Sequence, residues 1–231
     1  MIDVGLFSGA LSGNYTHENN MNYDRQYYLL TEDSQSGPYM LVKNKKSDEG
    51  LSRLLAMRSI KRQVLGPGYI NITLGDNGNF KPCDYHEVLP AGLVSEKFKN
   101  ILDSFQLPGV DFYPAYIENR GNIWKEHYLI HIWQNHRALH PKRSVYDGTY
   151  ENDRFDLKKM TLNEEVLDLV PLHERLVFRL HEKPHYLYHE SVVVALKAAG
   201  LTGVNFLNIQ NWGPGSAFAT EEEEDDFYNN L

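Results

Sequence analysis

The sequence has very little cysteine, since Cys83 is the only one among 231 residues. An internal disulfide is therefore excluded, and a single free thiol is typical of a protein kept in a reducing compartment. No uncharged apolar run approaches the ~18 residues of a membrane-spanning helix, and the residues after Met1 lack the basic start of a secretory signal. We expect a cytoplasmic protein without a membrane partner.

Basic charge is also scarce. Lys and Arg number 23 against 31 Asp and Glu, which gives a net charge of −8 with neutral histidines. Residues 221–226 supply six of the acids, so the rest of the chain is close to neutral, at −2. Because no basic stripe is present, direct binding to nucleic acid is disfavoured.

Motifs of known enzymes are missing as well. The chain has no Gly-x-Ser-x-Gly element, no P-loop and no dinucleotide fingerprint. Cys83 and His86 are close in sequence, but such neighbours seldom form a nucleophile and its base, and Pro82 favours a loop there. We expect a protein that is not an enzyme and needs no cofactor.

Histidine, in contrast, is abundant, and its ten residues make a metal site the main alternative. His136 and His140 have the spacing that puts two imidazoles on one helical face. Pro141 ends any such helix, and a third ligand would have to come from the preceding strand, for example His127 or His131. We expect surface histidines and no bound metal; the alternative is a metal-dependent hydrolase that uses this histidine-rich middle segment.

A second set of histidines is spaced by four residues: His181, His185 and His189. Pro184 and the strand-like residues 186–188 interrupt the helix that would align them. We therefore expect these histidines in turns or at the rim of the fold.

The chain contains an internal duplication. Residues 93–112 align without a gap with residues 187–206, 94 positions further on. The identical pairs include Glu96 and Glu190, Leu102 and Leu196, Leu107 and Leu201, Gly109 and Gly203, Val110 and Val204, and Phe112 and Phe206. In both copies apolar residues recur at helical spacing before an alternating Val-x-Phe segment, which predicts a helix, a tight turn and a strand.

Three glycines of the duplicated unit are expected to be structural. Gly200 lies where a left-handed residue ends the second helix. Gly109 and Gly203 occupy the turns before the two strands, where a positive φ favours glycine.

Strand-like segments outnumber helical ones and do not alternate with them regularly, which predicts an α+β fold, mainly antiparallel sheet with a duplicated helix-turn-strand unit. We divide the chain into a lead-in segment (1–26), a single domain (27–212) and an acidic tail (213–231). The domain contains both copies of the unit.

Other elements are expected within this domain. Residues 27–30 and 39–42 are strand-like and could pair as a hairpin, and residues 51–58 suggest a short helix. Strands are also expected at residues 69–74 and 128–133. Residues 134–156 are polar with few apolar anchors, which predicts a long surface excursion.

Several short sequence strings occur along the chain, and their order is more specific for a protein family than any single string. They are LVSE (93–96), LPGVDFYP (107–114), YLI (128–130), SVY (144–146), VFRL (177–180) and AGLTGVNF (199–206). Together they resemble the bacterial polymorphic-toxin immunity family first defined on a myxobacterial protein, which was formerly catalogued as a domain of unknown function. The resemblance implies a cytoplasmic protein that binds a cognate toxin, encoded next door, and neutralises it by occlusion. It implies no catalytic residue.

Aromatic residues are numerous, with fifteen Tyr, ten Phe and three Trp. Tyr and Trp are common at the energetic centres of protein interfaces. Those with polar neighbours are the candidates for contact with a partner: Trp124, Tyr146, Tyr150 and Trp212.

The tail provides a second candidate for partner binding. Its acidic run consists of Glu221, Glu222, Glu223, Glu224, Asp225 and Asp226. Such a run usually only solvates the chain. It could instead attract a basic toxin by imitating phosphate, with Phe227 and Tyr228 as apolar anchors.

Overall fold

The computed structural model describes residues 22–33, 40–42, 58, 68–72, 80–88, 91–150 and 154–216. One sheet has the spatial order β13 (Val204–Asn208), β1 (Tyr27–Glu32), β12 (Tyr186–His189), β11 (Val177–Leu180) and β8 (Asn135–His136). The other has the order β2 (Met40–Val42), β3 (Gly68–Ile72), β6 (Val110–Asn119), β7 (Asn122–Ile132), β5 (Ala91–Ser95) and β4 (Tyr85–Val88). A separate ribbon joins β9 (Val145–Thr149) to β10 (Arg154–Lys159).

Most strand pairs are antiparallel; β3 with β6 and β8 with β11 are parallel. The described helices are α2 (Glu96–Ser104), α3 (Glu164–Leu167) and α4 (Glu190–Ala198), with 3-10 turns η1 (Tyr23–Arg25), η3 (Leu172–Glu174) and η4 (Ile209–Asn211). The expected α+β fold with mainly antiparallel sheet is confirmed. No helix among the described residues is long and apolar enough to cross a membrane.

The duplicated unit is also present in the fold. β5, α2 and β6 repeat as β12, α4 and β13, and both the helices and the starts of the following strands are offset by the 94 positions of the sequence alignment. Ser95 caps α2 by accepting a hydrogen bond from the Phe98 amide, and His189 caps α4 by accepting one from the Ser191 amide. The helix-turn-strand prediction therefore holds in both copies.

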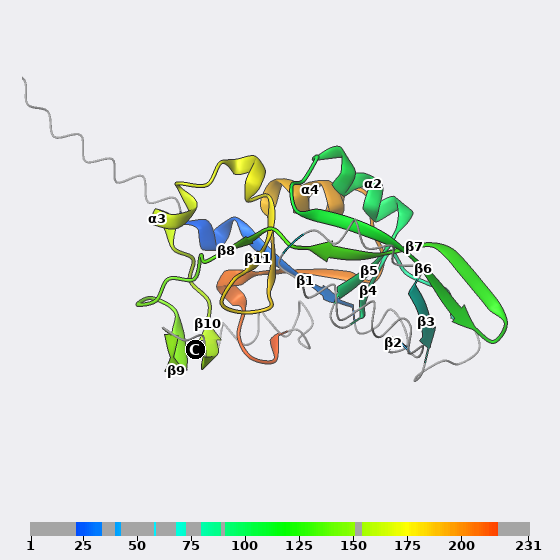
Figure 1. The fold of residues 1–231 in the computed structure, drawn as a ribbon, viewed down its shortest axis with the longest axis horizontal. Coiled ribbons are helices and arrows are strands. Elements are labelled where there is room, and N and C mark those ends of the chain that lie inside the picture. Colours follow the sequence, from blue (N-terminus) through cyan, green and yellow to red (C-terminus); the bar gives the residue numbers. More distant parts are fainter. Residues whose placement is uncertain are drawn as a thin grey trace, which may run out of the picture.

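The two helices form a shared core. Figure 1 shows α2 and α4 next to each other along the same side of the two sheets. Phe98 and Leu102 of α2 pack in one cluster with Val192 and Leu196 of α4, and all four are fully buried. Burial of a side chain of this size contributes roughly 1.5–3 kcal/mol, so this cluster is a main source of stability.

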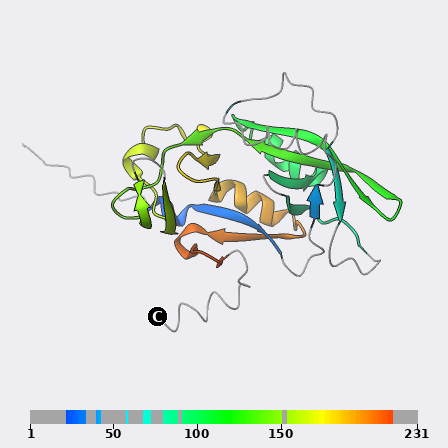
Figure 2. The same ribbon diagram turned by 60° about the horizontal axis from the view of Figure 1, so that its bottom comes forward.

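A hairpin between residues 27–30 and 39–42 is wrong. β1 lies between β12 and β13, whereas β2 pairs with β3 in the other sheet. Figure 2 shows β1 and β13 side by side, although they come from opposite ends of the described chain. Both edges of β1 are thus occupied by the second copy of the duplicated unit.

The segment 134–156 is more than a surface excursion. Ala138 and Leu139 are fully buried, and Phe155 is buried in the same cluster. Leu139 is fixed by a bridge to Leu162 and by a hydrogen bond from its amide to the Glu182 carboxylate. The prediction was wrong for Ala138 and Leu139; the partners of Leu139, Leu162 and Glu182, are distant along the chain.

Packed structure also begins before residue 27. Tyr23 of η1 is only 1% exposed, so residues 22–26 belong to the folded body rather than to a loose lead-in. The strand expected at residues 69–74 is confirmed as β3, and the buried strand at 128–133 as part of β7. The helix expected at residues 51–58 lies outside the described residues except for Arg58.

Candidate partner-binding site

The α3–η3 loop, defined here as residues 163–175, exposes the most prominent apolar side chain of the described chain. Leu169 is 85% exposed and Leu172 is 47% exposed. They are separated by Val170 and Pro171; Leu169 lies between α3 and η3, and Leu172 is the first residue of η3. Isolated exposed leucines are ordinary, but two of them at the tip of one loop indicate a contact surface.

Backbone hydrogen bonds hold this loop in shape. Asn163 caps α3 by accepting a hydrogen bond from the Glu165 amide at 3.1 Å. The Val170 amide donates to the Leu167 carbonyl at 3.1 Å, and the Arg175 amide donates to the Leu172 carbonyl, also at 3.1 Å. The leucines therefore extend from a backbone with its own regular turns.

Arg175 ties the loop to the sheet beneath it. Its Nε donates to the Val170 carbonyl at 3.0 Å, and its Nη1 donates to the Tyr27 hydroxyl oxygen at 3.2 Å. The Tyr27 hydroxyl in turn donates to the Arg175 carbonyl at 3.0 Å. The guanidinium also lies 4.8 Å from the ring centre of Tyr23. Because Arg175 is 9% exposed, these contacts are largely shielded from water.

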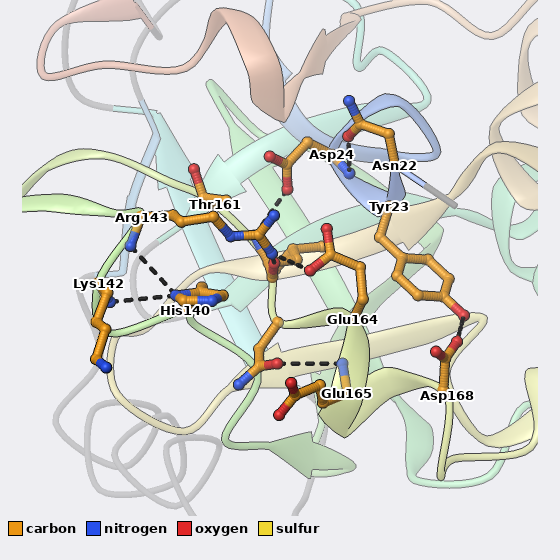
Figure 3. Close-up of polar contacts among 12 residues, drawn as sticks. Asn22, Tyr23, Asp24, His140, Lys142, Arg143, Thr161, Glu164, Glu165 and Asp168 are labelled. Carbon is orange, nitrogen blue, oxygen red and sulfur yellow. Dashed lines mark hydrogen bonds and ion pairs between the residues drawn. The ribbon is translucent and has the colours of Figure 1, made fainter. Parts of the chain in front are cut away.

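The N-terminal turn η1 supports the loop from another side (Figure 3). The Tyr23 hydroxyl donates to Asp168 Oδ1 at 2.5 Å, and the Leu162 amide donates to Asp24 Oδ1 at 2.7 Å. Burial and the hydrogen bond to Asp168 raise the pKa of Tyr23 to about 12, while burial raises the pKa of Asp24. Tyr23 therefore stays a neutral donor, and the segment before β1 and the loop form one structural unit.

Apart from the buried Arg175, the charged side chains of the loop are acidic. Residues 163–174 contain four acids and neither Lys nor Arg. Glu164 forms an ion pair with Arg143, as Figure 3 shows. Glu165 and Asp168 are exposed, and Glu174 is half-exposed. The leucines are consequently flanked along the chain by carboxylates, an arrangement that suits a basic protein surface.

The four aromatic candidates do not form one surface. Trp124 lies on β7, where its ring meets Phe80 edge to face at 5.6 Å. Tyr146, Tyr150 and Trp212 pack instead against the cluster that contains Phe155. In Figure 1 the tip of the β6–β7 hairpin and the β9–β10 ribbon lie at opposite ends of the molecule.

Three of these aromatics make internal contacts that use part of their surface. The Tyr146 hydroxyl donates to the Pro141 carbonyl and the Tyr150 hydroxyl to the Leu139 carbonyl, both at 2.8 Å. Trp212 meets the His185 ring edge to face at 4.9 Å. All three are half-buried, so each retains an accessible part. Their role in partner binding stays a prediction, as does that of the acidic run and residues 227–228, which lie outside the described residues.

The histidines of the middle segment bind the backbone. His136 Nε2 lies 3.2 Å from the Glu174 carbonyl, and His140 Nδ1 accepts hydrogen bonds from the amides of Lys142 and Arg143 at 3.1 and 3.2 Å. Across the described ranges, no three His, Cys, Asp or Glu side chains are grouped so that they could hold a metal ion. In the other set of histidines, at residues 181, 185 and 189, burial lowers the pKa of His185 to about 4.

Cys83 and His86 do not have the geometry of a nucleophile and its base. His86 is fully buried; its Nε2 accepts a hydrogen bond from the Cys83 amide at 2.9 Å, and its Nδ1 lies 2.9 Å from Glu32 Oε1. The ring nitrogen that a base would use is therefore occupied by the backbone. Burial also raises the pKa of the Cys83 thiol, which disfavours the thiolate.

The exposed leucines are the residues that sequence reasoning missed. Leucine within a folded domain usually suggests burial, so its residue type gave no sign of exposure here. The signal that was present is the unusual density of acids beside Leu169, Pro171 and Leu172. Neither family models nor curated proteins provide a match to the chain.

Proposed function

We propose that this chain is an immunity protein that binds a cognate bacterial toxin in the cytoplasm and neutralises it by occlusion, without catalysis. The observation that carries the proposal is the α3–η3 loop. Leu169 and Leu172 are exposed there, hydrogen bonds hold the backbone, and most of the charged side chains are acidic. Such a feature offers contact area and charge but no reacting group.

Physical support for the proposal comes from the burial free energy that the exposed leucines do not gain in the free protein. An exposed leucine lacks a burial free energy of roughly 1.5–3 kcal/mol, which contact with a partner can recover. Because Arg175 already holds the Val170 carbonyl and Tyr23 already holds the Asp168 side chain, less conformational entropy remains to be lost on binding. Both properties favour association with another protein.

The resemblance of the short sequence strings to a polymorphic-toxin immunity family supports the same function. It adds an expectation about the partner, a toxin encoded next to this chain. The surface charge agrees with this expectation when the toxin is basic, as toxins that act on nucleic acid often need to be.

A metal-dependent hydrolase remains the competing proposal. It would require His140 to give up the hydrogen bonds that its Nδ1 accepts from the amides of Lys142 and Arg143, because with Nδ1 as acceptor the neutral ring carries its proton on Nε2. Metal analysis of the purified protein distinguishes the two functions, because stoichiometric zinc that is lost in a His136→Ala/His140→Ala variant would favour the hydrolase.

The direct test is co-expression with the adjacent toxin gene. We expect growth to be restored when this chain is produced together with the toxin, and the two proteins to co-purify as a complex. Continued toxicity at equal toxin levels, with the chain folded and abundant, would contradict the proposal.

A further inference from the structure

We infer that the α3–η3 loop is the docking element, and that it inserts Leu169 into an apolar pocket with a basic rim on the partner protein. The inference rests on the proposed function for the identity of the partner as a toxin. It adds which surface makes the contact and what chemistry the partner must present.

Leu169 is the anchor because of its position as well as its exposure. It follows Asp168, the C-cap of α3, and its amide donates to the Val166 carbonyl at 3.3 Å, so its backbone is fixed while 85% of the residue is accessible. Leu172 lies beyond Pro171 and starts η3. A few side chains that fill well-packed, fully desolvated pockets carry most of the binding energy of an interface, and this is the role we infer for Leu169.

The basic rim follows from the charge around these leucines. Glu165 and Asp168 precede Leu169 on α3 and its C-cap, and Glu174 follows Leu172 on η3. Residues 163–174 carry no Lys or Arg, and Arg175 at the end of the loop is 9% exposed, so the exposed acids Glu165 and Asp168 have no exposed Lys or Arg beside them in the loop. An acidic partner would bring like charges together at the edge of an apolar contact, whereas lysines or arginines would pair with them.

Tyr23 is a positioning residue for this surface. Its hydroxyl holds Asp168, the residue directly before Leu169, at 2.5 Å. Tyr23→Phe removes that hydrogen bond but leaves both leucines and all the carboxylates in place. We expect affinity to fall by about 3-fold, with faster dissociation, because the loop must then be ordered on binding.

The first test measures affinity for the product of the adjacent toxin gene, purified in a catalytically disabled form. Leu169→Asp should weaken binding by at least about 10-fold, and Leu172→Asp by a smaller factor. The matched control is Val194→Asp, because Val194 is also apolar and 64% exposed but lies on α4. Equal affinities for wild type, Leu169→Asp and Val194→Asp, at unchanged thermal midpoints, would overturn the docking site.

The second test addresses the rim. Glu165→Lys should weaken binding by about 10-fold at low salt and reduce the dependence of affinity on salt. Glu190→Lys is the control, because Glu190 is an exposed acid in the first turn of a helix, as Glu165 is. Tighter binding by Glu165→Lys would show that the partner is acidic there and would overturn the basic rim.

These outcomes separate the two proposals. If the wild-type chain neither binds the toxin nor restores growth, the proposed function fails. If the wild type protects and the loop variants protect and bind equally well, only the docking site fails. Sedimentation of the wild type and of Leu169→Asp tests whether a second copy of this chain binds the loop instead. A wild-type dimer that dissociates in the variant would assign the loop to self-association and overturn the inference.

Discussion

The two halves of the molecule use one arrangement of strands but assemble it from different parts of the chain. In the first half the spatial order is β6, β7, β5, β4, and in the second it is β13, β1, β12, β11. β7 follows β6 through a hairpin, whereas β1 comes from the start of the described chain and occupies the equivalent place. The strand order is therefore determined by side-chain packing and pairing rather than by connectivity.

The equivalence extends to the register. Val94 pairs with Tyr128 in the first half, and Tyr188 pairs with Tyr28 in the second. Likewise Phe112 faces Ile130, and Phe206 faces Leu30. β1 is therefore the equivalent of β7, and its residue numbers are lower by 100, whereas those of the other equivalent strands are higher by 94. A gap-free alignment of the two copies cannot detect this pair of strands.

Some differences between the halves concern single positions. Gln106 and Gly200 are equivalent and both have positive φ, of +51° and +59°. At one cross-strand pair the first half has Ser95 opposite His127, and the second has His189 opposite Tyr27. The shared backbone geometry tolerates different side chains at these sites, which makes them suitable for direct comparison.

The largest expected effect concerns Gly109 and Gly203. Their φ values are +74° and +77°, and an added Cβ would lie 2.6 Å from the amide nitrogen of Gln134 or from the carbonyl oxygen of Tyr85, respectively. Substitution by valine in either half combines backbone strain with a clash, so we expect each change to lower the free energy of unfolding by about 3 kcal/mol or more. Urea unfolding of both variants measures the loss.

Gly200→Gln is the matched control, because it copies Gln106 of the first half. Nothing lies within 4 Å of a Cβ added at Gly200, so only the cost of a left-handed residue remains, about 1–2 kcal/mol. If the valine variants cost no more than this control, close approach of the backbone is not what the two halves have in common.

The next effect concerns pH and the pair Ser95 and His189. His189 Nδ1 must be unprotonated to accept the Ser191 amide, and burial lowers its pKa below the usual 6.5. A lowered folded-state pKa means that the unfolded chain takes up the proton first as the pH falls. The stability is therefore complete above about pH 6.5 and is lost as the pH falls through the folded-state pKa.

His189→Ser gives the second half the cap of the first. We expect the cap to persist at pH 8 and the loss of stability below pH 6.5 to become smaller than in the wild type. His189→Ala removes the cap and should cost about 1 kcal/mol at pH 8. Burial also lowers the pKa of His127 and His185, the latter to about 4, so part of the slope should remain. An unchanged slope in His189→Ser would assign it entirely to those groups.

Local pattern was sufficient to predict the duplicated helices and strands. The spacing of Phe98 and Leu102 repeats in Val192 and Leu196, and these residues do face a common core. Local pattern could not place β1, because its neighbours are more than 150 residues away and the nearest strand-like segment belongs to the other sheet.

Burial was harder to predict than secondary structure. Tyr23 and Leu139 lie in polar surroundings along the chain but are buried by distant partners. Leu169 shows the reverse, because hydrophobicity predicts burial and the bracing by Tyr23 and Arg175 keeps it exposed. The candidate site depends on these long-range contacts and was therefore not found from sequence, whereas the structural glycines follow from local turn chemistry.

The smallest expected effect concerns two lysines that reach equivalent aromatic pairs from different helical positions. Lys99 Nζ lies 5.6 Å from the ring centre of Phe112 and 5.5 Å from that of Tyr128. Lys197 Nζ lies 5.4 Å from Phe206 and 5.8 Å from Tyr28. The lysines are one helical turn apart when the halves are aligned, so the aromatic pair rather than the helix position determines the contact.

Lys99→Gln and Lys197→Gln should each cost about 0.5–1 kcal/mol in urea unfolding at low salt. Lys99 also forms an ion pair with Asp103 at 2.5 Å, and such an exposed pair adds only about 0.3–0.5 kcal/mol and is screened by salt. In 1 M NaCl the two variants should therefore cost the same, because the cation–π contact is the part the halves share. A difference that persists at high salt would mean that the two lysines stabilise their halves by different interactions.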